Sequence, residues 1–138
     1  MVGVDASEGM LDRARARDAA LGLPGATWLH RSAEDLDDVQ PVDRLLWFLG
    51  LSVVPDPDRL FAATWDKLVP GGLCAIVDVH AARRVPQTWV VETIARADLR
   101  RRPWTHLEER CEGFRKEVLS DWSSIHGGTL FLAAGRKP

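Results

Sequence analysis

The sequence predicts an α/β protein whose sheet is mostly parallel. Across residues 1–80, short apolar segments that suit buried strands alternate with amphipathic segments of helical length. Near the C-terminus, Gly127-Gly128 separates two more strand-like segments, which indicates an antiparallel hairpin that closes the sheet. A chain of 138 residues can bury a core of its own, so we expect a single domain over residues 1–138.

Composition and charge argue against several classes of function. A formal net charge of −2 gives no overall attraction to nucleic acids. Cys74 and Cys111 lie far apart and have no CxxC partner, so we expect small buried thiols, no disulfide framework and no metal site. The sequence has no apolar run long enough to span a membrane and no signal-peptide pattern at its N-terminus. We therefore expect a cytoplasmic protein.

The N-terminal elements follow from apolar segments and helix-capping residues. Val2–Asp5 is short and apolar, as buried parallel strands are. Ser7 is a good N-cap for a helix that runs to Leu21, where glycine and proline stop it. Ala26–His30 is predicted as the second strand. Leu45–Leu49 is predicted as the third strand, and because it is apolar on both faces we expect it to be central.

Proline and glycine mark the elements that follow. Asp56 is an N-cap, and Pro57 is the first residue of a helix that Pro70-Gly71-Gly72 ends. Leu73–Val79 is predicted as a fourth strand, and the order of elements suits right-handed crossovers in a parallel sheet. The C-terminal third is predicted to form two helices and then two strands, over Pro86–Arg102, Thr105–Cys111, Arg115–Trp122 and Thr129–Gly135.

Asp5 occupies the most informative position in the chain. It ends the first predicted strand, and ligands of open α/β sheets bind at the carboxyl ends of the strands. A carboxylate there can accept two hydrogen bonds from the diol of a ribose. No glycine-rich turn precedes Asp5, because the sequence begins at Met1. The alternative is that Asp5 only caps the helix that follows it.

Several stretches together carry a resemblance to a known family. They are Gly3–Leu11, Ser32–Leu36, Val42-Asp43, Val53–Pro57, Leu68–Leu73 and the closing hairpin within Gly113–Pro138. In this order and spacing they resemble the class I S-adenosylmethionine-dependent methyltransferases over nearly the whole chain. The resemblance implies a Rossmann-like fold with helices on both faces of the sheet. It also implies S-adenosyl-L-methionine as the cofactor and direct in-line transfer of its methyl group to an acceptor.

The chain departs from that family at its N-terminus. Domains of the family open with a strand and a Gly-x-Gly-x-Gly turn, and that strand lies between the strands predicted here at Val2 and Leu45. The sequence lacks this first βα unit, which leaves an open ladder edge on both flanking strands. Three explanations stay open: the protein starts further upstream, the sequence is a fragment, or the two strands pair with each other or with a second copy.

The resemblance also implies roles for residues at the strand ends. Asp5 would accept hydrogen bonds from the ribose hydroxyls, while Ser32 and Ala33 would face the adenine, with a simple surface turn as the alternative. Many members carry an acidic residue at the position of Ser32, and a serine is the weaker acceptor. Phe48 and Leu49 would line the methionine end of the cofactor, or else belong to the core. The cofactor-binding set is therefore Asp5, Ala6, Ser32, Ala33, Phe48 and Leu49.

His80 is the candidate catalytic residue. It follows the fourth predicted strand, and a histidine there can act as a general base because its ordinary pKa is near neutral. Methyl transfer to an amine or an oxygen needs an aligned nucleophile, methyl group and sulfonium, and a sink for one proton. The alternative is an exposed histidine at a strand exit, without a chemical role.

A cluster of arginines beside Trp89 and Trp104 bears on the acceptor. It consists of Arg83, Arg84, Arg96, Arg100, Arg101 and Arg102. Such residues suit a phosphate headgroup or an anionic membrane surface, and a solvated helix face is the alternative. A second, thinner resemblance is carried by Leu51–Asp56, Val77–His80, Arg83-Arg84 and Leu107–Arg110. These stretches look similar to phosphatidylethanolamine and betaine-lipid N-methyltransferases, which implies a headgroup amine as acceptor and peripheral membrane contact.

We therefore expect an S-adenosylmethionine-dependent methyltransferase for a small-molecule or lipid-headgroup acceptor, with the activity of the chain as given left open. A non-catalytic structural subunit is the alternative. It would oligomerise through the open sheet edge, as a homodimer or with another chain, and would have no affinity for the cofactor. A nicotinamide-dependent oxidoreductase also carries an acid at the end of its second strand. The Pro-Gly-Gly turn and the closing hairpin argue against that third class.

Overall fold

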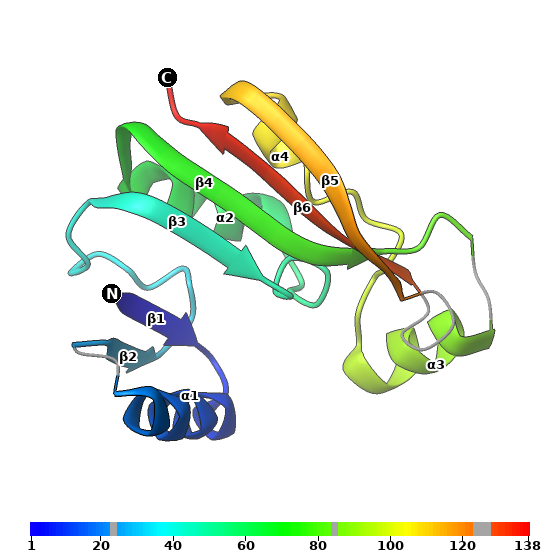
Figure 1. Cartoon of the computed structure of the whole chain (residues 1–138), viewed down its shortest axis with the longest axis horizontal. Helices are drawn as coiled ribbons and strands as arrows, with labels where there is room; N and C mark the ends of the chain where they lie inside the picture. The colour runs from blue at the N-terminus through cyan, green and yellow to red at the C-terminus, as the bar shows by residue number, and fades with distance from the viewer. Residues whose placement is uncertain (23–24, 84–85, 123–127) are drawn as a thin grey trace. The chain divides into compact units, whose positions relative to one another are not determined.

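A computed structural model describes residues 1–22, 25–83, 86–122 and 128–138 (Figure 1). The chain forms two compact units, Met1–Val39 and Gln40–Pro138, which we call the N-terminal unit and the C-terminal unit. Each unit contains its own sheet, with parallel strands in both and an antiparallel hairpin in the second. The predicted α/β class is therefore confirmed.

The N-terminal unit is a βαβ arrangement. It consists of β1 (Val2–Asp5), α1 (Glu8–Leu21) and β2 (Thr27–His30). The two strands are parallel, with their C-terminal residues opposite one another. Gly22 closes α1 in the left-handed conformation, with φ 61°. The ends of β1 and α1 agree with the sequence prediction, and β2 begins one residue later than predicted.

Trp28 joins the three elements of the N-terminal unit. Its ring covers Gly3 on the neighbouring strand, where an added Cβ atom would lie 2.1 Å from the ring. Its indole N–H donates a hydrogen bond to Oδ2 of Asp18 on α1, at 2.7 Å. On the same helix, Leu11 is buried. Glycine at position 3 is thus explained by the close approach of an aromatic ring.

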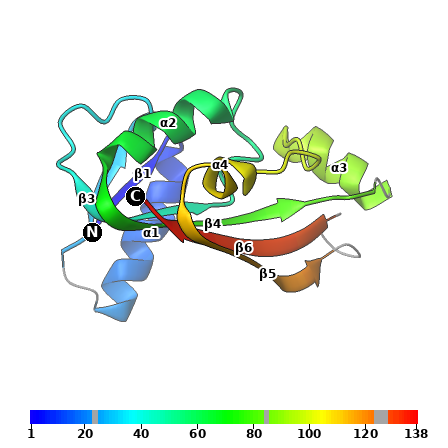
Figure 2. The ribbon, with the colours of Figure 1, turned by 90° about the horizontal axis from the view of Figure 1, so that it is seen from above.

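The C-terminal unit is a mixed sheet with α2 and α4 on one face (Figures 1 and 2). The strand order is β3-β4-β6-β5, in which β3 and β4 are parallel and β6 is antiparallel to both of its neighbours. The elements are β3 (Val42–Phe48), α2 (Pro57–Lys67), β4 (Leu68–His80), α3 (Pro86–Ala95), α4 (Thr105–Glu108), β5 (Glu112–Trp122) and β6 (Gly128–Arg136). The predicted closing hairpin is confirmed; most of its predicted turn, residues 123–127, lies outside the described residues.

The core of this unit lies between the sheet and the helices α2 and α4. Cys74 and Ile76 of β4 point into it and alternate with less buried neighbours, as expected for a strand with one covered face. They pack with residues of α2, α4 and β6, among them Phe61, Trp65, Leu107, Phe131 and Ala133. Burial raises the pKa of the Cys74 thiol to about 12 and also raises that of Cys111, so both stay protonated and weakly reactive near neutral pH.

The position of β3 in the sheet differs from the prediction. The sequence predicts a central strand, but β3 is an edge strand that pairs with β4 alone. Leu46 and Phe48 on its open face are 62% and 65% exposed. β1 likewise pairs only with β2, so within the described residues both strands have one free ladder edge, as expected without the first βα unit. An apolar pattern on both faces is typical of central strands. Here the strand that would pair with the second edge of β3 belongs to the first βα unit, which the sequence lacks.

The Pro-Gly-Gly segment also differs from the prediction. Rather than ending α2, it lies inside β4, which begins directly after the helix at Leu68. The register between β3 and β4 shifts here, from Val42 opposite Leu68 to Arg44 opposite Leu73. Gly71 adopts φ 76°, and its N–H donates to the carbonyl of Lys137 at 2.8 Å. The segment therefore makes an irregular strand that is held by the C-terminal residues of the chain.

The helices of the C-terminal third are shorter than predicted. α3 ends at Ala95 and not at Arg102, because Arg96 adopts a left-handed φ of 52°. The chain then turns back, and the N–H of Asp98 donates to the carbonyl of Ser52 at 2.7 Å. α4 likewise stops at Glu108, short of the predicted end. Tertiary hydrogen bonds thus replace helical ones in this region.

His106 on α4 is expected to make the fold less stable at acidic pH. Its ring stacks on Phe61 with centroids 4.9 Å apart, and its Nδ1 lies 3.5 Å from Oδ1 of Asp58. Burial lowers the pKa of His106; Asp58 opposes this effect and Arg110 adds to it. Below pH 6.5 the unfolded chain therefore binds more protons than the folded chain, so the free energy of unfolding decreases as the pH falls through the folded-state pKa.

The His106→Gln variant should show a smaller loss of stability on acidification than the wild type. Urea unfolding at several values between about pH 7 and pH 5 measures this difference, because that range contains the histidine titration. His30→Gln, at an exposed histidine of the N-terminal unit, is the matched control. An identical pH dependence in wild type and His106→Gln would contradict the prediction.

Candidate functional site

The candidate residues lie in both units, at the carboxyl ends of parallel strands. In the N-terminal unit, Asp5 ends β1 with a half-buried side chain. Its Oδ1 accepts a hydrogen bond from the backbone N–H of Ser7 at 2.7 Å, at the start of α1. Ser7 itself makes no side-chain capping bond. Asp5 therefore helps to cap the helix with one oxygen, while the described contacts leave Oδ2 available for a ligand.

His30 lies directly across from Asp5 and was not predicted as a site residue. Its Nε2 is 3.1 Å from the carbonyl oxygen of Ala6; since a carbonyl only accepts, Nε2 carries the hydrogen of this bond. The N–H of Arg31 donates to the carbonyl of Asp5 at 3.2 Å. These bonds fix the β1–α1 turn against the end of β2. The signal in the sequence was a histidine at the end of the second predicted strand.

Ser32 and Ala33 lie in a turn directly after the end of β2. The Ser32 hydroxyl accepts from the N–H of Glu34 at 3.3 Å, and its carbonyl accepts from the N–H of Asp35 at 3.0 Å. This is the geometry of the surface turn that we considered as the alternative, and Ser32 is exposed. The hydroxyl still has its own hydrogen to donate. Beside it, the hydrogen bond with Asp38 raises the pKa of the Arg31 guanidinium.

In the C-terminal unit, Phe48 and Leu49 stand at the end of β3. The Phe48 side chain is 65% exposed, which contradicts the alternative that it belongs to the core. Leu49 adopts a left-handed φ of 53°, and its N–H donates to the carbonyl of Val77 at 2.8 Å. A left-handed leucine costs about 1–3 kcal/mol and persists only where its surroundings hold it. The strand therefore ends in a sharp, fixed turn.

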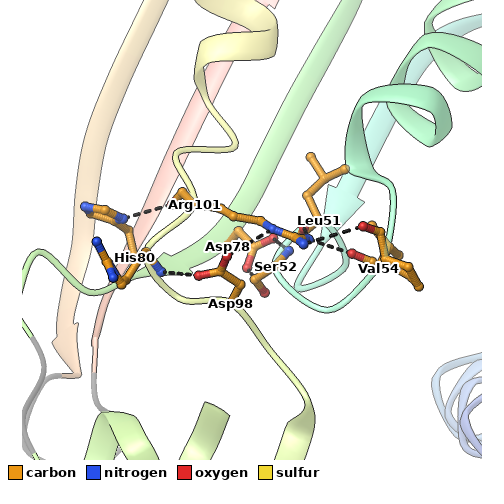
Figure 3. Close-up of polar contacts among 9 residues, drawn as sticks. Leu51, Ser52, Val54, Asp78, His80, Asp98 and Arg101 are labelled. Atoms are coloured by element: carbon orange, nitrogen blue, oxygen red, sulfur yellow. Dashed lines mark hydrogen bonds and ion pairs between the residues drawn. The ribbon is translucent and has the colours of Figure 1, made fainter.

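Asp78 is the buried acid that holds the loop after this turn (Figure 3). Its Oδ2 accepts from the N–H of Ser52 at 3.1 Å, and its Oδ1 accepts from the Ser52 hydroxyl at 2.7 Å and the Val79 N–H at 2.8 Å. Burial raises the pKa of Asp78, and the hydrogen bonds from Ser52, Val79 and Leu51 oppose that rise. The prediction did not include this role, because it joins residues that are far apart in the sequence.

Arg101 binds the same loop from its other side (Figure 3). Its Nη1 donates to the carbonyls of Val54 at 2.5 Å and Leu51 at 3.4 Å, and its Nε lies 3.4 Å from Oδ2 of Asp98. The N–H of Asp98 in turn donates to the carbonyl of Ser52. Asp78 and Arg101 together clamp residues 51–54 between the end of β4 and the segment after α3.

His80 ends β4, beside the strand that ends in Phe48 (Figure 3). It is half-buried, so the alternative of an exposed histidine does not hold. Its Nδ1 lies 2.9 Å from the carbonyl of Arg101 and must donate to it, which leaves Nε2 as a proton acceptor in the neutral ring. The ring meets Trp104 edge-on, with centroids 4.8 Å apart. His80 thus has a fixed tautomer and a fixed orientation.

The predicted arginine cluster divides in the structure. Arg101 is engaged in the loop clamp, whereas Arg83, Arg96, Arg100 and Arg102 are exposed. Arg84 lies outside the described residues. In the part of the chain that the structure describes, no group of three histidine, cysteine or acidic side chains is placed to hold a metal ion.

Parallel strands joined through helices, with polar side chains and fixed turns at their carboxyl ends, are typical of a Rossmann-like α/β fold. A family model described as a methyltransferase domain matches residues 1–72, and the chain belongs to that family. No curated protein sequence matches the chain.

Solved methyltransferase structures share this fold. The N-methyltransferase NodS from Bradyrhizobium japonicum WM9 aligns with a TM-score of 0.74 at 14% identity, over 99% of this chain and 72% of that one. Phosphoethanolamine N-methyltransferase 2 from Haemonchus contortus aligns with a TM-score of 0.75 at 16% identity, over 99% of this chain and 43% of that one. The chain thus corresponds to part of each of these longer proteins, and at such identities the likeness concerns the fold.

Proposed function

We propose that the chain binds S-adenosyl-L-methionine and takes part in methyl transfer from it. Membership of the methyltransferase domain family supports this proposal, and the geometry of Asp5 is the observation that carries it. Asp5 ends a parallel strand, its Oδ1 is bonded to the helix start, and its Oδ2 can accept from a ribose hydroxyl. NodS has been solved with S-adenosyl-L-homocysteine, and the Haemonchus enzyme with S-adenosyl-L-methionine.

We propose a separate role toward the cofactor for residues at the strand ends of each unit. Asp5 would bind the ribose diol, with the Ala6 backbone beside it. The Ser32 hydroxyl and Ala33 would face the adenine, and Phe48 and Leu49 the methionine end. When bound, the cofactor supplies an electrophilic methyl group on a sulfonium, which leaves as a neutral thioether.

His80 is proposed as the proton acceptor for the nucleophile. Its Nδ1 is occupied by the Arg101 carbonyl, so the basic lone pair is on Nε2. The ring is held by Trp104 and cannot turn freely. We propose a small-molecule or lipid-headgroup amine or hydroxyl as the acceptor. The Haemonchus enzyme has been solved with phosphomonomethylethanolamine, a small molecule that carries an amine and a phosphate.

Calorimetric titration of S-adenosylhomocysteine into the 138-residue chain tests the proposal. We expect saturable binding by the wild type and a loss of about 10- to 100-fold in affinity for Asp5→Ala, as for removal of a hydrogen bond to a charged group. Asp12→Ala, at an exposed carboxylate on α1, is the matched control and should bind as the wild type does. A folded wild type that does not bind, or an Asp5→Ala variant with unchanged affinity, would contradict the proposal.

A structural role is the second candidate function. The observation that favours it is the free ladder edge of β3, which is bordered by the exposed side chains of Leu46 and Phe48. A chain in that role would self-associate through this edge and would not bind the cofactor. Sedimentation velocity beside the titration separates the two functions, since only the structural role predicts an oligomer without affinity for S-adenosylhomocysteine.

A further inference from the structure

The helix α3 carries an apolar stripe that faces solvent. Trp89, Val90 and Ile94 are 64%, 44% and 80% exposed, and their spacing places them on one side of the helix. Thr88, which lies off this stripe, is fully buried. The solvent-facing side of α3 therefore carries several large apolar side chains, and such a group on a surface often marks an interaction site.

Exposed arginines flank α3 in the sequence. Arg83 precedes α3, and Arg96 and Arg100 follow it; all three side chains are exposed. Residues 83–102 contain six arginines and only two acidic residues, in a chain whose net charge is −2. Of those acids, Glu92 is half-buried on the helix and Asp98 is paired with Arg101. Basic charge is thus concentrated in the same segment of the chain as the exposed apolar side chains.

We propose that α3 is a membrane-docking helix that lies flat on an anionic lipid surface. Tryptophan and aliphatic side chains on one face of such a helix enter the boundary between headgroups and acyl chains. Arginines beside them bind headgroup phosphates through paired N–H donors. Among the described helices, none combines the length and the apolar character required to cross a bilayer.

The composition of the stripe favours a lipid surface over a second copy of the chain. A two-fold contact through α3 would bring identical arginines face to face, which is repulsive. A stable protein interface also buries about 800 Å² on each partner, and three side chains on a short helix do not provide that area. A bilayer needs no such area, because each apolar side chain inserts independently.

Docking through α3 would have a consequence for the carboxyl ends of the strands. The helix is connected on one side to β4, which ends in His80, and on the other to the segment that holds Arg101. Docking would therefore bring the segments that carry these two residues toward the membrane. The proposal stands apart from the proposed cofactor binding, because docking is measured without any cofactor.

Co-sedimentation with lipid vesicles tests the proposal on the 138-residue chain. We expect stronger binding to phosphatidylcholine vesicles that contain phosphatidylserine than to phosphatidylcholine alone, and weaker binding at higher salt. The double variant Trp89→Ser with Ile94→Ser should bind at least about tenfold more weakly, because two large apolar side chains no longer insert. Met10→Ser with Leu21→Ser, at apolar residues of α1 that are 50% and 60% exposed, should bind as the wild type does.

The charge contribution has its own matched pair of variants. Arg83→Gln with Arg100→Gln should clearly reduce the preference for phosphatidylserine, whereas Arg13→Gln with Arg17→Gln on α1 should leave it intact. Equal binding of the wild type to both kinds of vesicle would overturn the proposal. So would a double variant Trp89→Ser with Ile94→Ser that binds vesicles as tightly as the wild type does. Loss of self-association in the stripe variant, seen by sedimentation velocity, would also overturn it, because a second copy would then cover α3.

Discussion

Replacing Asp78 with alanine is expected to lower the free energy of unfolding by about 3 kcal/mol or more, because it leaves buried donors without their acceptor. The carboxylate accepts from the Ser52 N–H, the Ser52 hydroxyl and the Val79 N–H, and it is fully buried. Urea unfolding at neutral pH, followed by tryptophan fluorescence, measures the loss.

Two further variants show whether the loss of stability in Asp78→Ala comes from its hydrogen bonds. Asp66→Ala removes an exposed carboxylate from α2 and should change stability by less than about 0.5 kcal/mol. Asp78→Asn keeps the shape of the side chain but turns an amide donor toward other donors, so it should also destabilise. If Asp78→Ala costs no more than Asp66→Ala, the loop after β3 is not held by Asp78, and the clamp that we describe is wrong.

Elements with local signals could be predicted from the sequence. α2 begins as expected, with the Asp56 side chain accepting from the Arg59 N–H and Pro57 in the first turn. α1 ends at Leu21 because glycine follows it and takes the left-handed conformation. In both cases the determining residues lie within one helical turn of the boundary.

Elements that depend on distant contacts could not be predicted. α3 ends at a left-handed arginine, a residue with no preference for that conformation, and the chain there bonds to the loop after β3. The Pro-Gly-Gly segment is a good helix stop by composition, yet it forms part of β4 because Lys137 supplies its backbone partners. Tertiary hydrogen bonds decide both cases, and a single sequence does not reveal them.

The candidate site divides in the same way. Asp5 and His80 are predicted as site residues because each stands at the end of an apolar strand, and strand ends are where α/β folds bind ligands. The contacts of Asp78 with Ser52, 26 residues away, and of Arg101 with Val54, 47 residues away, left no such signal. The sequence thus indicates candidate ligand-binding positions at strand ends, whereas the buried contacts that hold the neighbouring loop become visible only in the structure.

Phe61→Ala is the second variant with a large expected effect, a loss of about 3–5 kcal/mol in the free energy of unfolding. Phe61 is fully buried on α2 and stacks with Trp65 and His106, at centroid distances of 5.6 and 4.9 Å. Its removal leaves a cavity that these two rings cannot fill. Thermal and urea unfolding both report the loss.

The matched control for Phe61→Ala is the same substitution at Phe48. Phe48 is 65% exposed on the open face of the same sheet, so its removal should cost less than about 1 kcal/mol. The contrast tests where the core lies, because both variants lose a phenylalanine side chain. Phe61 packs against the covered face of the sheet, whereas Phe48 projects from the open face. Equal losses would contradict the placement of the core on the face that α2 and α4 cover, and would show that the β3 face is also packed in the native protein.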